Sequence, residues 1–260
     1  MEKPLQGLKK MQTRIQKEKE FHNKRFSKET REQLDKYYAV SPLINKYFDS
    51  RFEEACKGKV VLEYGCGLGD HAFKIAGIAS RVHAIDISEV AIAKAKEIAK
   101  RNSVNNVSFY VMNAEELNFS DNYFDAICGI AILHHLDLNS AFKEITRVLK
   151  KDGKIFFIEP MGHNPIINYF RNKTSHLRTE DEHPFLKKDL ELLDKYFMHK
   201  NIRHFNLLSL LSIPFRNKKS FLNILKFLTA IDKVLFKVKF FRYQSWHVVI
   251  ECSAPKKLFI

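Results

Sequence analysis

Between residues 58 and 159, short apolar runs alternate with helical patterns, and this alternation restricts the chain to few folds. The best helix signal is Ser88–Arg101, where Ser88 can cap the first turn and Ala and Ile recur at helical spacing. Alternating elements of this length predict a parallel sheet with helices on both faces, in which ligands bind beyond the carboxyl ends of the strands. The apolar runs predict strands at Val60–Tyr64, Val82–Ile85, Val107–Met112, Phe124–Ile130 and Lys154–Glu159.

The first predicted strand runs into a loop with Gly65, Gly67 and Gly69 at alternate positions. Glycine lets the backbone turn tightly and lets a ligand approach the main chain. The dinucleotide pattern GxGxxG needs a glycine where this chain has Asp70, so the match to nicotinamide enzymes is imperfect. Glu63 would repel a pyrophosphate but could hold a cation, directly or through water. The loop therefore predicts a ligand that carries positive charge.

Polar side chains also follow the next two predicted strands. Asp86 lies at a spacing from the glycine loop at which a carboxylate meets ribose hydroxyls, although it could instead only begin the following helix. Asn113 and Glu115 follow the third strand and could hydrogen-bond an adenine edge. Together these residues indicate a ligand with an adenosine group.

The order of these motifs resembles that of the class I S-adenosylmethionine-dependent methyltransferases, in particular the branch with small-molecule or lipid-like acceptors. The resemblance covers Tyr37–Glu159, which includes "VLEYGCGLG", "VHAIDIS", "FDAICGIAILHHL" and "RVLKKDGKIFFIEP". Trp246–Ser253 looks like the closing strand. The resemblance implies an α/β, Rossmann-like fold with a seven-stranded, mostly parallel sheet, helices on both faces and an antiparallel last strand.

The same resemblance implies S-adenosylmethionine as the cofactor. It puts Glu63 and the glycine loop beside the methionine part, Asp86 on the ribose hydroxyls and Ile87 against the adenine. Asn113 stands where the family often has Asp, and its amide oxygen can still accept a hydrogen bond. The cofactor-binding positions implied in this way are Glu63, Gly65, Cys66, Gly67, Gly69, Asp86, Ile87, Asn113, Ala114, Glu115 and Ile130.

A sulfonium methyl group is already activated, so such an enzyme mainly holds the acceptor in line with it. A hydroxyl or protonated amine also needs a general base, and His135 and His163 are the predicted catalytic residues because they follow the fourth and fifth strands. The alternative is that the His134–His135 pair only shapes its loop. The predicted acceptor-binding residues are His134, Glu159, Asn164, Arg178 and His183.

Two polar stretches after the fifth strand, "EPMGHNPIINYFR" and "RTEDEHPF", predict a substrate cap. Equally, Arg178 with Asp181 or Glu182 could form an ion-pair network that braces the loop. His163, Asp181, Glu182 and His183 have the side chains of metal ligands, but their spacing matches no familiar site, so no metal is predicted.

The predicted organisation is an N-terminal helical arm or cap at 1–57 and a methyltransferase domain at 58–260, with a cap region at 160–199. Residues 1–36 are polar and mixed in charge, which predicts a solvated helix or a loosely held arm. An insertion is expected at 205–243, before the last strand.

This insertion carries much of the chain's formal net charge of +14, because Lys200–Phe241 holds nine Lys or Arg against one acid, Asp232. Its apolar residues recur at helical spacing, which predicts a basic, apolar helix. Contact with an anionic membrane is one interpretation, and packing on the domain or on a second subunit is the more usual fate of an apolar stripe. The residues at this spacing are Phe221, Ile224, Leu225, Leu228, Ile231, Leu235 and Val238.

Positive charge also suits nucleic acid, so an RNA methyltransferase is an alternative, as is a non-catalytic protein that binds the adenosine cofactor. RNA is disfavoured because the fourth strand runs into "GIAILHHL" and not into the N/D-P-P-Y/F signature of base-amine methylation. No apolar run has the length of a spanning helix and no signal segment is seen, so a cytoplasmic protein, with possible peripheral membrane contact, is expected. The acceptor, the atom methylated and the oligomeric state stay open.

Overall fold

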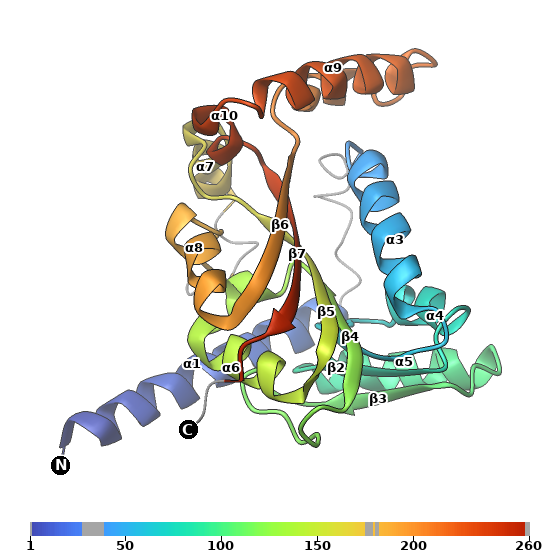
Figure 1. Ribbon diagram of the computed structural model, residues 1–260, viewed down its shortest axis with the longest axis vertical. Coiled ribbons are helices and arrows are strands. Elements are labelled where there is room, and N and C mark those ends of the chain that lie inside the picture. Colours follow the sequence, from blue (N-terminus) through green and yellow to red (C-terminus); the bar gives the residue numbers. More distant parts are fainter. Residues whose placement is uncertain (1, 28–38, 175–178, 180–181, 258–260) are drawn as a thin grey trace.

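The computed structural model describes residues 2–27, 39–174, 179 and 182–257. Its seven strands form one sheet in the order β3-β2-β1-β4-β5-β7-β6 (Figure 1), in which β7 runs antiparallel to both of its neighbours, β5 and β6. The predicted fold class is therefore confirmed. The strands are β1 Val60–Tyr64, β2 Arg81–Asp86, β3 Val107–Val111, β4 Phe124–Ile130, β5 Leu149–Pro160, β6 Phe197–Phe205 and β7 His247–Pro255.

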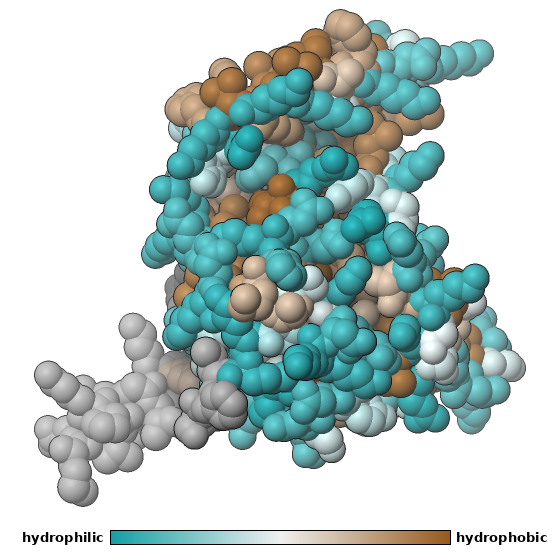
Figure 2. Space-filling model, in the orientation of Figure 1, coloured by the Kyte–Doolittle hydropathy of each residue, from teal (hydrophilic) through white to brown (hydrophobic). Residues whose placement is uncertain are grey.

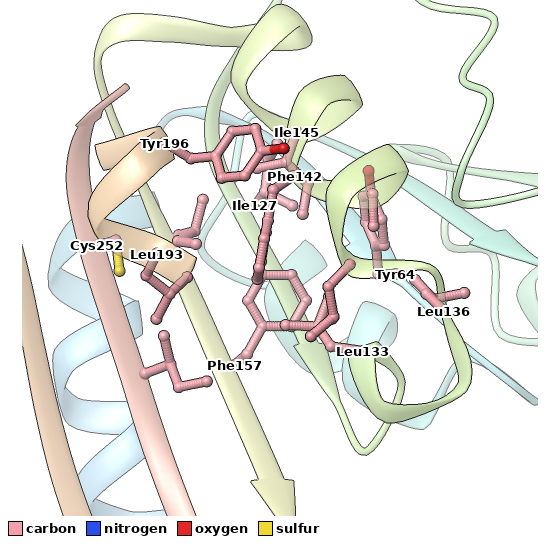
Figure 3. Packing of buried hydrophobic residues seen from close by; sticks show 14 of the residues in the cluster. Tyr64, Ile127, Leu133, Leu136, Phe142, Ile145, Phe157, Leu193, Tyr196 and Cys252 are labelled. Atoms are coloured by element: carbon pink, nitrogen blue, oxygen red, sulfur yellow. The ribbon is translucent and has the colours of Figure 1, made fainter. Parts of the chain in front are cut away.

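Helices cover both faces of this sheet, as Figure 1 shows. One face packs against α3 (Pro42–Cys56), α4 (Asp70–Ala76) and α5 (Glu89–Arg101). The other packs against α6 (Leu138–Val148) and α8 (Lys187–Tyr196). On that second face Figure 3 shows side chains of the sheet, such as Phe157, meeting those of the helices. The core fixes the strands, and with them the edge where the strands end.

Helix α5 begins where its sequence predicts. The Ser88 hydroxyl accepts a hydrogen bond of 3.1 Å from the backbone N–H of Ala91, which satisfies one of the otherwise unpaired donors of the first turn. Ala91, Ile92 and Ala95 are buried on the face that meets the sheet. The helix therefore holds the end of β2 and the loop that follows it in a fixed position.

The first helix, α1 (Glu2–Ser27), packs across α5. The Asn23 side chain accepts a hydrogen bond of 2.7 Å from the Ser88 hydroxyl, and Lys94 donates one of 2.8 Å to the backbone carbonyl of Phe26. The described part of the predicted loose arm is thus a helix tied to the domain by side-chain and main-chain bonds.

The segment predicted as a cap contains α7 (Pro165–Lys173) and α8, while its last residues, from Phe197, belong to β6. The insertion joins β6 to β7 and lies at 206–246. It consists of η3 (Leu208–Phe215), α9 (Phe221–Leu235) and α10 (Lys239–Tyr243). Phe205 and His247, at its two ends, are directly paired in the sheet. In Figure 1, α9 lies beyond the end of the sheet, apart from the helices on its faces.

Candidate cofactor and acceptor site

A cavity of about 880 Å³ lies at the carboxyl ends of β1, β2 and β4. Its walls are the glycine loop after β1, the ends of β2 and β3, the loop 130–136 after β4, helix α1 and the start of α3. A cavity of this size is large enough for a nucleotide-sized ligand. Nine of the predicted cofactor positions line it: Gly65, Cys66, Gly67, Asp86, Ile87, Asn113, Ala114, Glu115 and Ile130.

Glycine is required in this loop both by the backbone φ angles and by side chains that lie close to it. Gly65 and Gly67 have φ angles of 63° and 53°, in the left-handed region that favours glycine. A Cβ on Gly65 would lie 3.0 Å from the Ile132 side chain, and one on Gly67 would lie 3.2 Å from the ring of Phe26 on α1. Glycine therefore keeps the main chain exposed to the cavity while allowing these close contacts.

Asp86 is the last residue of β2, and its side chain is hydrogen-bonded to the glycine loop. One carboxylate oxygen accepts a hydrogen bond of 2.9 Å from the backbone N–H of Gly67, and the other accepts one of 2.8 Å from Ser88. Each oxygen has a further lone pair with which it can accept from a hydroxyl. The carboxylate is thus held in one orientation at the cavity wall, where each oxygen can still accept a hydrogen bond.

Glu63 and Gly69 lie outside the residues that line the cavity. Glu63 is buried, and one of its oxygens lies 3.1 Å from Nδ1 of His71. Burial raises the pKa of Glu63, and this effect outweighs the opposing effect of His71. The structure therefore gives Glu63 no direct contact with the cavity and leaves the predicted pairing with a cationic ligand without support.

The end of β3 is closed by α1. The Glu115 carboxylate accepts hydrogen bonds of 2.5 and 2.7 Å from Arg14 and one of 2.8 Å from the backbone N–H of Asp137. Asn113 accepts a hydrogen bond of 3.0 Å from the Glu115 backbone. Glu115, predicted to meet an adenine edge, thus serves to fasten α1 and the loop after β4 to the site.

Glu159, near the end of β5, fixes the conformation of the loop after β4 through hydrogen bonds. It is completely buried and accepts hydrogen bonds of 3.0 and 2.8 Å from the backbone N–H groups of Ile132 and Leu133. Its second oxygen lies 2.7 Å from Nδ1 of His134. Burial lowers the pKa of His134, and this effect outweighs the opposing effect of Glu159. Glu159 does not line the cavity and is placed to position the loop, while His134 does line it.

His135 lines the cavity where the loop after β4 meets α1. Its Nδ1 lies 3.4 Å from an oxygen of Glu18, and Nε2 of His22 lies at the same distance from that oxygen. Burial lowers the pKa of His135, but the Glu18 carboxylate outweighs it and the net shift is upward. Sequence reasoning missed Arg14, Glu18 and His22. The signal available was the spacing of Glu18 and His22, which puts both side chains on one face of a helix.

Other predicted residues lie elsewhere. Nε2 of His163 accepts a hydrogen bond of 2.9 Å from the Lys187 backbone, and Asn164 caps α7. His183 donates its backbone N–H to the carbonyl of His134, and its side chain lines a smaller neighbouring pocket. Arg178 lies outside the described residues. The structure therefore brings His134 and His135 to the cavity but not His163, Asn164 or His183.

Comparison with known proteins assigns the chain to a protein family. A family model described as a methyltransferase domain matches residues 55–225. The chain is similar to the uncharacterized methyltransferase YcgJ of Bacillus subtilis, with 32% identity over 120 residues that cover 45% of this chain and 47% of that protein. It is also similar to the ubiquinone/menaquinone biosynthesis C-methyltransferase UbiE of Zymomonas mobilis, with 35% identity over 102 residues, 38% of this chain and 41% of that protein. The chain thus spans less than half the length of these relatives.

Among solved structures, the fold is similar to that of phosphoethanolamine N-methyltransferase 2 of Haemonchus contortus in complex with phosphomonomethylethanolamine and S-adenosylhomocysteine. The TM-score is 0.64 at 20% identity, and the match covers 90% of this chain and 60% of that one. At this identity the likeness concerns the fold alone.

Proposed function

Because the chain belongs to the methyltransferase domain family, we propose that it transfers a methyl group from S-adenosylmethionine to a small-molecule or lipid-like acceptor. The observation that carries this proposal is the cavity that joins the glycine loop, Asp86 and the loop after β4. Its residues fit the cofactor, because Gly65 and Gly67 border the cavity without a side chain and the oriented carboxylate of Asp86 is suited to the ribose hydroxyls.

The chain's own residues then bind and orient the reactants. Asp86 would accept hydrogen bonds from the ribose, Ile87 would pack on the adenine, and the exposed main chain of the Gly65–Gly67 loop would border the methionine part. S-adenosylmethionine supplies a methyl group on a sulfonium sulfur, which needs only an aligned acceptor. His134 and His135, on the loop after β4, are the cavity residues placed to meet that acceptor.

Calorimetric titration of the purified protein tests cofactor choice. We expect micromolar binding of S-adenosylmethionine and S-adenosylhomocysteine and no binding of NADH, because the loop lacks the third glycine of the dinucleotide pattern. Labelled methyl transfer into lipid, small-molecule and RNA fractions then identifies the acceptor class. A folded sample that binds neither adenosyl compound would contradict the proposal, and binding without transfer to any fraction would favour a non-catalytic protein.

We further propose that the acceptor is reached at an anionic membrane surface through the insertion at 206–246. Apolar side chains are exposed there: Phe227 and Phe240 are each 66% exposed and Val234 is 61% exposed. Figure 2 shows apolar side chains gathered where Figure 1 draws α9 and α10. Of the apolar residues in α9, only Leu225 is buried. The predicted stripe packs largely on the chain itself, chiefly on η3, because only Val238 of its residues is exposed. The exposed apolar side chains Leu222, Phe227 and Val234 lie on the remaining surface of α9.

The charge of this insertion is one-sided. Its single acid, Asp232, is buried, and its carboxylate accepts hydrogen bonds from the backbone N–H groups of Leu207, Leu208 and Ser209. The basic residues that remain are Arg216, Lys218, Lys219, Lys226, Lys233, Lys237, Lys239 and Arg242. Exposed apolar area and uniform positive charge together favour an anionic lipid surface.

Nothing in the described part of the chain suggests a membrane crossing, since no helix there is both long and apolar enough. The proposed contact is peripheral. α7 adds to the same character, because it carries Arg171 and Lys173, has no acid, and leaves Ile166 and Phe170 more than half exposed.

A double variant tests this surface. F227S with F240S should lower the affinity for vesicles containing anionic lipid about tenfold or more, because each phenylalanine contributes about 1.5–3 kcal/mol when fully buried. The matched control replaces two exposed apolar residues outside the insertion, Val111 and Met198, with serine. Co-sedimentation measures both pairs. Equal binding by the two double variants, or a wild-type protein indifferent to anionic vesicles, would refute the membrane proposal.

A further inference from the structure

We propose that Glu18 and His22 of α1, together with His135 of the loop after β4, bind a divalent transition-metal ion at the wall of the cavity. All three residues line the cavity, and their ligand atoms lie within 4.8 Å of one another. The site joins two segments that are far apart in the sequence. None of these three residues is among the four whose spacing was considered for metal in the sequence analysis.

The spacing of the ligand atoms suits a metal ion. One oxygen of Glu18 lies 3.4 Å from Nε2 of His22 and 3.4 Å from Nδ1 of His135. Hydrogen bonds between such groups are shorter, at about 2.7–3.2 Å. Ligands placed about 2.0–2.2 Å from a tetrahedral ion are about 3.3–3.6 Å apart, so both distances match adjacent corners of a coordination shell.

Glu18 supplies an independent observation. The residue is only 5% exposed, and its carboxylate faces His22 and His135 at 3.4 Å without a short hydrogen bond to either ring. Burial raises the pKa of Glu18, but the two imidazoles outweigh it and the net shift is downward. A buried carboxylate without donors is costly, and such groups normally pair with a cation or coordinate a metal. The buried carboxylate of Glu115, at the same wall, has close donors. A metal ion bound between Glu18 and the two imidazoles would balance the charge of this buried carboxylate directly.

The donor set indicates the class of ion. Two imidazoles and one carboxylate form a ligand set used by zinc and by divalent iron, and hard ions such as Mg²⁺ and Ca²⁺ prefer oxygen alone. Glu18 and His22 are one helical turn apart, so α1 presents both ligands on one face. His134, His135 and Glu182 form a second group of ligand atoms within 4.8 Å, which shares His135 and extends the site along the cavity.

The ion would serve the proposed methyltransferase, so this part of the inference rests on that function. Three protein ligands leave coordination positions open, as in catalytic metal sites. An oxygen or nitrogen atom of the acceptor could occupy one of these positions and be held beside the sulfonium methyl. His135 would then be a metal ligand and not the general base that the sequence indicates.

Titration of the metal-free, full-length protein with Co²⁺ tests the site without any cofactor, so its outcome is separate from that of the methyltransferase proposal. We expect visible absorption bands that saturate at one Co²⁺ per chain and competition by Zn²⁺. E18Q and H22N should each weaken Co²⁺ binding by at least about tenfold, because each removes a direct ligand.

The matched controls are E20Q, on the exposed side of α1, and H199N, on the exposed part of β6. Both should bind Co²⁺ within about twofold of wild type, given that neither residue lies near the site. Circular dichroism checks that every variant is folded. A wild-type protein that binds no Co²⁺ or Zn²⁺, or E18Q and H22N variants that bind as tightly as their controls, would overturn the proposal.

Discussion

Replacing Asp86 with alanine is expected to weaken S-adenosylmethionine binding by roughly 10- to 150-fold, which corresponds to about 1.5–3 kcal/mol for hydrogen bonds to a charged group. The reason lies in its geometry. The carboxylate is fixed by the backbone N–H groups of Gly67 and Ser88 and still has lone pairs for two ribose hydroxyls. Calorimetric titration of wild type and variant measures the change.

Two further variants separate the hydroxyl contacts from the shape of the loop. Asp86→Asn keeps the size of the side chain and one acceptor oxygen, so its loss of affinity should lie between wild type and alanine. Asp152→Ala removes an exposed carboxylate on β5 and should leave affinity unchanged. Undiminished affinity of the Asp86→Ala protein would withdraw the ribose assignment.

Replacing Glu159 with alanine is expected to lower the free energy of unfolding by about 3–5 kcal/mol, because each buried donor that loses its acceptor costs roughly 1–3 kcal/mol. The substitution leaves the backbone N–H groups of Ile132 and Leu133 and the His134 ring without their acceptor in the interior. Denaturant unfolding followed by circular dichroism measures the loss. Glu116→Ala, at an exposed position, should change stability by less than about 0.5 kcal/mol.

The same experiment decides between two roles for Glu159. If Glu159 only contacted the acceptor, the alanine variant would lose methyl transfer but would be as stable as the wild-type protein. If Glu159 holds the loop after β4, the alanine variant would lose both methyl transfer and stability, because Ile132 and His134 of that loop form part of the cavity wall. We expect the second pattern, and an alanine variant as stable as wild type would contradict it.

The parts of the fold that sequence reasoning predicts are those set by local signals. The bounds of β1 and β4 follow from their apolar runs, and Ser88 caps α5 as its side chain predicts. Asp86 reaches the cavity because a strand end in a parallel sheet has a fixed place relative to its neighbours.

The unpredicted parts depend on contacts between distant segments. Arg14 bonds to Glu115 and His135, 101 and 121 residues away, and no local pattern reports such pairings. Glu159 and His163 show the converse. Glu159 lies near the end of the fifth strand and His163 just after it, but hydrogen bonds with the loop after β4 and with Lys187 decide where their side chains lie. The sequence shows which chemical groups these residues carry, but only the tertiary packing determines where their side chains point.

The insertion has a further consequence through the way its two ends meet. Phe205 and His247 are paired across β6 and β7, and the Trp246 N–H donates to the Asn206 carbonyl just beyond them. A segment that leaves and re-enters the sheet at one point can be lengthened, shortened or exchanged in evolution without shifting either strand, since loop closure depends only weakly on loop length. The length and composition of this insertion can therefore change without moving the strands whose ends form the cavity.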